Sequence, residues 1–288
     1  MLNKVSLKNE TMLVNDLKMI SQAYEEIAVM KMQKVRSNVL QTREFFTELL
    51  DVFFEVKASY KKQIERIIAQ KKNHNVNSVE QKNGKKAFVF LSANGNLYGP
   101  IIKDVLAKFL ADTEKESGEI VIIGRMGKQF FEERRPGKKY TYFDLPDADV
   151  TMEDMQKIAQ YLSEYETVKV YYGKFLNVMT QSPDASDITA QTQAEHKDDA
   201  VHIDAFFEPS LELVLIFFEN QVLDSLFKQT VHEAELARFA SRLKAMEEAL
   251  QNIDKKQRDL KREEWKIRHR LENKKMLESI KGISFWTK

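Results

Sequence analysis

The feature that most constrains this chain is a run of 72 residues, Ser210 to Lys281, that contains neither glycine nor proline. Because these two residues are the strongest helix breakers, a run of this length favours one continuous helix. At 1.5 Å per residue such a helix would be roughly 105 Å long, far longer than the helices of ordinary globular domains. We therefore predict one very long helix in the last part of the chain.

Apolar residues inside this run recur at alternating steps of three and four, the spacing of a left-handed coiled-coil seam. The seam consists of Leu236, Phe239, Leu243, Met246, Leu250, Ile253, Gln257, Leu260, Glu264, Ile267 and Leu271. Its polar members, Gln257 and Glu264, would have to be paired or released if they lay in a buried interface. We therefore predict a coiled coil that loosens toward Leu271.

A second long helix is predicted over residues 2–83, which also lack glycine and proline. Two sets of its side chains keep the three-four spacing: Leu13, Leu17, Ile20, Tyr24 and Ile27, and Phe46, Leu49, Phe53, Val56 and Tyr60. The polar run Lys71–Asn83 favours fraying of this helix before Gly84. Two long seams in one chain bury each other most economically as an antiparallel pair.

Residues 84–209 hold all five prolines and every glycine except Gly282. Apolar runs predict strands in this part, with the first two as parallel neighbours, at Ala87–Leu91, Glu119–Ile123 and Val168–Tyr172. Helical patterns alternate with them at Ile101–Leu110, Lys128–Glu133 and Met152–Tyr165. This alternation is typical of an α/β sheet.

The polar stretch Ser182–Ala200 is interpreted as a loose connection to a last strand at Val201–Phe207. The predicted fold class is therefore a long antiparallel coiled coil of two helices with a central α/β, Rossmann-like domain. The expected domains are a first coiled-coil helix (1–83), the α/β domain (84–209) and a long second coiled-coil helix (210–288).

Composition limits the classes of function. The 288 residues are 43% hydrophobic and 31% charged, with a net charge of +1, which allows a soluble protein with one sizeable core and extended helices. The absence of cysteine excludes disulfides and thiolate metal sites. No apolar run is long enough for a membrane span, and the first residues do not resemble a signal peptide, so we expect a cytoplasmic location.

Two glycine-containing loops, Asn94–Gly99 and Gly124–Lys128, follow predicted strands, where a phosphate-binding loop would lie. Both lack the spacing of phosphate-loop motifs, which favours a structural turn over nucleotide binding. The five histidines show no metal-ligand or triad spacing, and the paired carboxylates are adjacent on helices and diverge. We predict no catalytic residue, no cofactor and no metal site.

A basic surplus lies between Lys255 and Lys288, with 12 basic and 5 acidic residues. A solvated helix face, a nucleic-acid contact and a contact with an acidic protein all remain open from the residues alone. Neither aromatic interleaving nor a recognition fold supports nucleic acid, so we expect none.

Several segments resemble the γ subunit of rotary F-type ATPases. Asp16–Arg36 resembles the first-helix signature of this family through Ile20, Ala23, Ala28, Lys31, Met32 and Lys34. Ile123–Phe131 (IGRMGKQFF) matches the family's IGxKGxxFF, and Tyr172–Pro183 (YGKFLNVMTQSP) matches YxKFxNxMxQxP. Phe207–Pro209 and Ser241–Asn252 resemble the family's YEP and ARMxAMxxAxxN segments. The motifs follow one another in the family's order.

The chain also departs from the family pattern. Ser92–Ile101 (SANGNLYGPI) keeps only Ser92, Leu97 and Gly99 of the Gly-rich SxDxGLCGxL turn. Arg270–Lys275 replaces the family's polar stretch near the end of the last helix. The resemblance is therefore to a divergent, γ-like member.

The resemblance implies a central rotor shaft that couples ATP hydrolysis or synthesis to rotation and performs no catalysis itself. Its coiled coil would penetrate a ring of three catalytic and three non-catalytic nucleotide-binding subunits, with the α/β domain at the foot. Expected partners are these ring subunits and an ε-like or other foot subunit, in a complex peripheral to the cell membrane and without a membrane span in this chain.

Because the family's catalytic subunits present an acidic loop to the shaft, the resemblance implies cationic contacts with the ring. The expected contact residues are Lys31, Lys34, Arg36, Arg242, Lys266 and Arg268. Two alternatives remain: the shaft of a specialised hydrolytic motor that is not coupled to ion transport, and a coiled-coil scaffold without an ATPase. The scaffold would leave the match at Tyr172–Pro183 unexplained.

Overall fold

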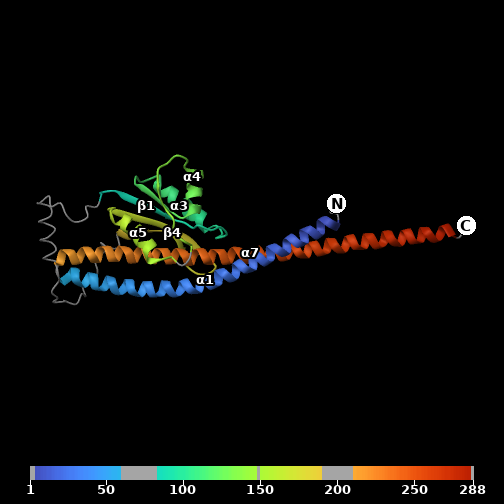
Figure 1. Cartoon of the computed structure of the whole chain (residues 1–288), viewed down its shortest axis with the longest axis horizontal. Coiled ribbons are helices and arrows are strands. Elements are labelled where there is room, and N and C mark those ends of the chain that lie inside the picture. The colour runs from blue at the N-terminus through green and yellow to red at the C-terminus, as the bar shows by residue number, and fades with distance from the viewer. Residues whose placement is uncertain (1–3, 60–82, 148–149, 190–209, 287–288) are drawn as a thin grey trace. The chain divides into compact units, whose positions relative to one another are not determined.

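The computed structural model describes residues 4–59, 83–147, 150–189 and 210–286 (Figure 1). The elements in chain order are α1 (Lys4–Ser59), β1 (Lys86–Leu91), α3 (Ile101–Thr113), β2 (Glu119–Ile123), α4 (Arg125–Arg134), β3 (Thr141–Phe143), α5 (Met152–Ser163), β4 (Thr167–Phe175), β5 (Gln181–Asp187) and α7 (Leu211–Trp286). These elements are divided between two compact units. The helix-pair unit contains Met1–Ala28 and Arg242–Lys288, and the α/β unit contains Val29–Ser241.

The α/β unit is built on a five-stranded sheet in the order β3-β2-β1-β4-β5. Strands β3, β2, β1 and β4 are parallel to one another, and β5 runs antiparallel to β4. Within the β1–β2 pair, Ala87 lies opposite Glu119 and Leu91 lies opposite Ile123. The mixed sheet flanked by long helices confirms the predicted fold class.

Each face of the sheet is covered by helices because the inner strands are apolar on both sides. Val89, Val121 and Val170 face α5 and α7, together with the aromatic side chains of α1 at Phe53 and Phe54. Phe88, Phe90, Ile122 and Tyr171 face the opposite side, where α3 and α4 pack. Figure 1 shows these two helical layers on either side of the sheet.

The structure confirms the three predicted strands and the helices between them, with α3, α4 and β4 longer than predicted. The short strand β3 was not predicted, because three half-buried residues carry no periodic signal. The prediction of a loose connection over Ser182–Ala200 is wrong for its first six residues, because Gln181–Asp187 forms β5. This polar strand pairs with β4 through backbone hydrogen bonds, and a search for apolar runs cannot detect such a strand. The predicted strand Val201–Phe207 lies outside the described residues.

Both long helices are present. Helix α7 begins after Ser210, whose Oγ accepts a hydrogen bond from the N–H of Leu213 at 3.3 Å, and it continues past Gly282. Helix α1 spans Lys4–Ser59, and the rest of its predicted length lies outside the described residues. None of the described helices carries an apolar stretch long enough to cross a bilayer.

The helix-pair unit is an antiparallel pair. Glu10 contacts Lys256 at 2.7 Å, and Lys18 contacts Asp254, also at 2.7 Å. The positions therefore rise along α1 as they fall along α7. Leu7, Val14 and Leu260 form the buried centre, with Ile253 and Ile267 beside them. This arrangement confirms the predicted antiparallel coiled coil.

The seam of α7 lies where its spacing predicts. On α1 the second predicted set is confirmed at Phe46, Leu49, Phe53 and Val56, which are buried or half-buried, but the first predicted set is wrong. Leu13, Leu17, Ile20 and Ile27 are 41% to 59% exposed, whereas the buried residues are Leu7, Val14, Ser21 and Ala28, spaced every seven positions. Small side chains such as Ser21 and Ala28 allow two helices to approach closely, so that larger side chains of the partner helix fill the space between them. The prediction chose the large apolar side chains of this part of α1, but the buried face is the one that carries the smaller side chains.

The polar seam positions behave differently from each other. The Nε2 of Gln257 donates to Oδ1 of Asn15 at 2.8 Å, so this position is paired inside the helix pair. Glu264 and Leu271 are exposed, and so are the side chains of α7 from Arg268 to Ile280. The seam therefore loosens toward Leu271, as predicted.

Candidate functional site

Helix α7 is buried on all sides between Thr230 and Ser241. On one side, Arg43 of α1 contacts Glu233, with 3.6 Å between Nη2 and Oε1. On another side, a Cβ placed on Gly173 of β4 would lie only 3.5 Å from the Cβ of Ala237 and 2.8 Å from the Cγ1 of Ile101. The missing side chain at Gly173 therefore lets α3 and α7 approach the end of β4.

This close approach places α7 at the carboxyl end of the sheet, between β1 and β4. The Nη1 of Arg238 donates to the backbone carbonyl of Ser92, directly after β1, at 2.5 Å. The rings of Tyr98 and Phe239 meet edge to face, with centroids 6.1 Å apart. In doubly wound folds ligands bind where neighbouring strands lead to opposite faces. In this chain α7 supplies side chains to that position.

Ionisable side chains lie around the same part of α7. Burial raises the pKa of the Glu233 carboxyl, and the Arg43 and Lys174 cations lower it only in part. The Nδ1 of His232 lies 3.1 Å from Oε2 of Glu235, and both side chains are buried. A buried polar group is costly unless it has a partner, so these contacts restrict how α7 can sit on the sheet.

The loop after β1 has the position of a phosphate loop, but its donors are used within the chain. The carboxylate of Asp147 accepts the N–H of Asn94 at 2.6 Å and the N–H of Gly95 at 2.5 Å. The Asn94 amide in turn donates to Asp144 and accepts the N–H of Arg125. Consecutive backbone N–H groups form an anion-binding concavity, and here an internal carboxylate occupies it.

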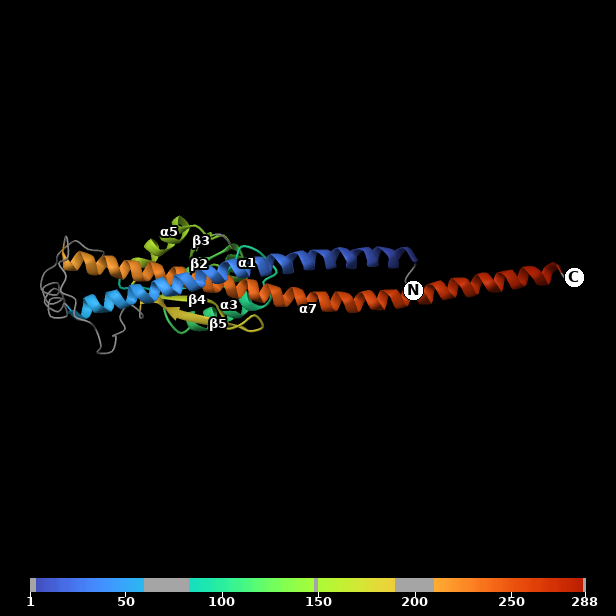
Figure 2. The same ribbon diagram turned by 90° about the horizontal axis from the view of Figure 1, so that it is seen from below.

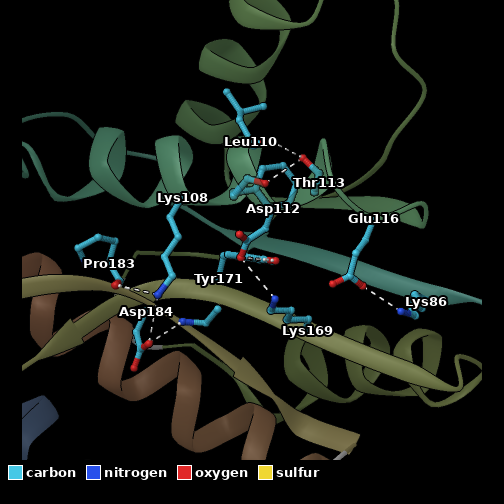
Figure 3. Close-up of polar contacts among 12 residues, drawn as sticks. Lys86, Lys108, Leu110, Asp112, Thr113, Glu116, Lys169, Tyr171, Pro183 and Asp184 are labelled. Carbon is cyan, nitrogen blue, oxygen red and sulfur yellow. Dashed lines mark hydrogen bonds and ion pairs between the residues drawn. The ribbon is translucent and has the colours of Figure 1, made fainter.

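Ionic contacts fasten α3 to the β4–β5 pair (Figure 3). Asp112 accepts the hydroxyl of Tyr171 at 3.1 Å and lies 3.4 Å from the Nζ of Lys169. Asp184 lies 3.0 Å from Lys174 and 3.4 Å from Lys108. Burial by itself would raise the pKa of both carboxyls, but the hydrogen bonds and cations around them hold each pKa below its usual value. These contacts therefore hold α3 and the β4–β5 pair in a fixed arrangement.

The cations expected to contact the ring fall into the two units. In the α/β unit, Lys34 and Arg36 are exposed on α1 and Lys31 is half-buried. In the helix-pair unit, Lys266 and Arg268 are exposed, and Arg268 lies 3.1 Å from Glu264 one helical turn away. Arg242 is 7% exposed, with its guanidinium 5.5 Å from the centre of the Tyr24 ring, which favours a role inside the helix pair for this residue.

Two kinds of residue at the carboxyl edge of the sheet were not predicted to have a role. Arg238 is one of many charged residues of α7, and no sequence pattern indicates that its side chain is buried. Leu97, Leu176 and Val178 are exposed apolar side chains in polar loops. Leu97 directly follows the polar run Asn94–Asn96, and an apolar residue in such a loop is the signal that could have identified it.

Comparisons with known proteins agree with this geometry. A family model described as ATP synthase matches residues 4–282. The chain belongs to this family, as a γ subunit. The ATP synthase gamma chain of Mycoplasmopsis pulmonis is 27% identical over 259 residues, which cover 85% of this chain and 86% of that one. The gamma chain of Staphylococcus carnosus is 24% identical over 245 residues, covering 81% of each.

Solved structures show the same fold. A chain in the structure of the central stalk and c-ring of the Tetrahymena thermophila mitochondrial ATP synthase superposes with a TM-score of 0.57 at 17% identity, covering 80% of this γ-family chain and 99% of that chain. A chain of the Euglena gracilis mitochondrial enzyme gives a TM-score of 0.56 at 14% identity, covering 88% and 93%. As a γ subunit, the protein is a subunit of an enzyme complex.

Proposed function

We propose that this γ-family chain is the central rotor shaft of an F1-type ATPase, enclosed by a ring of nucleotide-binding subunits whose ATP turnover is coupled to the angle of the shaft. The observation that carries this function is an uncovered apolar stripe on α1 in the helix-pair unit. Its members are 41% to 61% exposed: Met12, Leu13, Leu17, Met19, Ile20 and Ile27.

An apolar stripe of this kind is unusual on a protein that works alone, because monomers rarely leave large contiguous apolar patches in water. On α7 of the same unit, Trp265, Leu271, Met276, Leu277 and Ile280 are also 45% to 64% exposed. The two helices thus bury one stripe against each other and leave further apolar surface outward. A surrounding ring of subunits would cover that surface.

The exposed cations give the shaft its electrostatic contacts with the ring. Lys34, Arg36, Lys266 and Arg268 lie on the surface of the two long helices, and Lys31 is partly accessible. Contacts between solvated charges reach further and depend less on close fit than apolar contacts do, which suits partners that change at each step. We include these five residues in the proposed contact with the ring.

The chain itself performs no catalysis in this proposal. Support comes from the loop after β1, where the Asp147 carboxylate takes the N–H groups of Asn94 and Gly95 that a phosphate would need. Calorimetry of the purified chain with ATP and Mg²⁺ tests this part. We expect no heat of binding, and micromolar affinity would contradict it.

We also propose a cytoplasmic position at the periphery of the membrane, within the complex. We also propose that residues 1–83, 84–209 and 210–288 act as three functional parts, the two shaft helices and the foot. The compact units of the chain are divided differently, into the helix-pair unit and the α/β unit.

Co-purification tests the function as a whole. A tagged chain expressed in its own cell should recover catalytic and non-catalytic ring subunits, and the purified assembly should hydrolyse ATP. A tagged variant with Leu13→Glu and Leu17→Glu on the uncovered stripe should recover far less of the ring. Replacing Gln22 and Glu26, which are exposed and polar on the same helix, by alanine is the matched control and should change nothing. Recovery of the wild-type chain without ring subunits would refute the proposal.

A further inference from the structure

A cavity of about 580 Å³ lies between three helices of the α/β unit. Its walls come from residues of α1 between 38 and 45, of α5 between 155 and 159, and of α7 between 221 and 232. Figure 2 shows α1 and α7 running side by side in this unit, with α5 next to them. Sites for small molecules have volumes of about 300–1,000 Å³, so this cavity, which we call the three-helix cavity, is large enough for one.

The lining of the three-helix cavity is part apolar and part polar. Met155 and Ala159 belong to the buried core of the unit, and Val150 packs against that core. The ring of Phe45 is 50% exposed. The rest of the lining consists mostly of amides and hydroxyls, at Asn38, Gln41, Thr42, Gln156, Gln221 and Ser225. An apolar wall with a few convergent polar groups is the usual composition of a site for a small organic molecule.

The carboxylate of Asp224 is the unusual group in this lining. It is half-buried, and burial raises its pKa without an opposing cation. Among the residues that the structure describes, no side chain forms an ion pair or a hydrogen bond with it. A carboxylate that is withdrawn from water without a partner is costly to the fold.

Other carboxylates of the α/β unit in comparable positions have a cation beside them. The pairs are Glu233 with Arg43 at 3.6 Å, Asp184 with Lys174 at 3.0 Å and Asp112 with Lys169 at 3.4 Å. Within the described structure, Lys228 lines the same cavity one turn beyond Asp224 but forms no ion pair with it. His232, also in the lining, already pairs with Glu235 at 3.1 Å. The position beside Asp224 is therefore available to a cation from outside the chain.

The chemistry of the lining selects one class of ligand. An anion would meet the negative carboxylate, and a neutral apolar molecule would leave that carboxylate without a partner. Mg²⁺ and Ca²⁺ need several oxygen ligands, and the described parts of the chain contain no group of three or more histidine or acidic side chains that could hold a metal. An ammonium group satisfies the carboxylate both by its charge and by its hydrogen bonds.

We propose that the three-helix cavity binds a small organic amine, with the ammonium group on the carboxylate of Asp224 and the hydrocarbon body along Phe45, Val150 and Met155. The ligand is a free amine and not a side chain of a neighbouring subunit. The site is independent of the rotor function proposed above. Because the cavity touches α1, α5 and α7 together, a bound amine stabilises the folded unit by mass action.

Calorimetry of the purified full-length chain tests the ligand class with phenethylamine, which is protonated at neutral pH. We expect saturable binding and a higher thermal midpoint in the presence of this amine. Phenethyl alcohol and phenylacetate carry a similar body with a neutral and an anionic group, and each should bind at least about tenfold more weakly, because neither makes the charged hydrogen bond. Equal binding of either compound, or no saturable binding of the amine, overturns the proposal.

A variant of the carboxylate separates binding from folding. Asp224→Asn keeps the size of the side chain and removes an unpaired buried charge, so the chain should keep or increase its thermal midpoint. Its affinity for phenethylamine should fall at least about tenfold. The matched control is Asp104→Asn, which removes an exposed carboxylate of α3 outside the cavity and should leave binding unchanged. Unchanged affinity of Asp224→Asn with an intact fold would show that the amine does not bind here.

The same titration on the assembled complex distinguishes a free amine from a cationic side chain of another subunit. Retained binding supports the free amine. Binding that is present in the purified chain and lost on assembly means that another subunit covers the cavity, and it overturns the proposal. Failure of the chain to assemble would count against the proposed function only, because the titration of the purified chain still decides the site.

Discussion

The guanidinium of Arg238 donates a hydrogen bond of 2.5 Å to the backbone carbonyl of Ser92, so a side chain from the middle of the longest helix is fastened to the end of the first strand. Arg238 is 4% exposed and Ser92 is 3% exposed. Buried charges are retained only where their geometry is well defined. This contact links α7 to the carboxyl end of β1 within the α/β unit.

Truncation of this side chain should destabilise the α/β unit. We expect Arg238→Ala to lower the free energy of unfolding by about 2–4 kcal/mol, because it leaves a cavity and a buried carbonyl without its donor. Arg238→Met keeps most of the volume and should cost less. Urea unfolding of the full chain followed by circular dichroism measures both. Equal losses for the two variants would assign the effect to the hydrogen bond alone, and no loss in either would contradict the role of this contact.

Neighbouring positions on α1 distinguish its buried stripe from its uncovered one. Val14 is 7% exposed and packs near Leu260, whereas Leu13 is 59% exposed. We expect Val14→Ala to cost about 1–2 kcal/mol in the isolated chain and Leu13→Ala to stay within about 0.5 kcal/mol. In the assembled complex Leu13→Ala should weaken association, since its partner there is the ring. Thermal unfolding and subunit exchange measure the two effects, and the reverse order in the isolated chain would refute the observed seam.

The buried carboxyl of Glu233 should make stability depend on pH with an unusual sign. Burial raises its pKa in the folded chain, so the neutral form is favoured by folding and that contribution is lost as the pH rises through the raised value. Glu233→Gln mimics the neutral form. The variant should therefore be more stable than wild type near neutral pH, with an advantage that shrinks as the pH falls toward the ordinary range of a carboxyl.

Asp184 provides the opposite case within the same unit. Its pKa lies below the usual value because Lys174 and the N–H of Ala185 outweigh its burial. The stability that it contributes is present above the ordinary carboxyl pKa and is lost as the pH falls through the lowered one. Asp184→Asn should thus be less stable than wild type at neutral pH and match it in acid. Chemical unfolding across pH 3–8, about the range in which carboxyls titrate, compares both variants. Differences of the same sign would contradict the assignment.

The exposed cations should act together and not singly. A solvated ion pair contributes only about 0.2–1 kcal/mol, so Lys266→Glu or Arg268→Glu alone should change ATP hydrolysis by the assembled complex only mildly. Reversal of Lys31, Lys34, Lys266 and Arg268 together should uncouple or disassemble it, because like charges would then face the acidic loops that the family resemblance implies for the ring. The effect should be greatest at low ionic strength, where screening is weakest. Wild-type turnover by the quadruple variant at low salt would mean that these residues are only a solvated face.

The sequence by itself determined the two long helices, the parallel pair β1–β2 and the antiparallel pairing, because each depends on signals carried along the chain. Freedom from glycine and proline over Ser210–Lys281 leaves few conformations other than helix. Buried strands such as Glu119–Ile123 are apolar on both faces and stand out from their surroundings. The motif at Tyr172–Pro183 indicated the resemblance to the γ-subunit family.

Only the tertiary structure decided which face of each element meets which neighbour. The buried stripe of α1 passes through Ser21 and Ala28 and leaves the larger Leu17 and Ile20 outside, because the fit between two helices depends on the shapes of both. The polar strand Gln181–Asp187 exists because β4 offers it a backbone to pair with. Asp147 closes the loop at Asn94 from more than fifty residues away. Leu97 has a φ of +70°, a conformation that no local preference of leucine in the sequence would select.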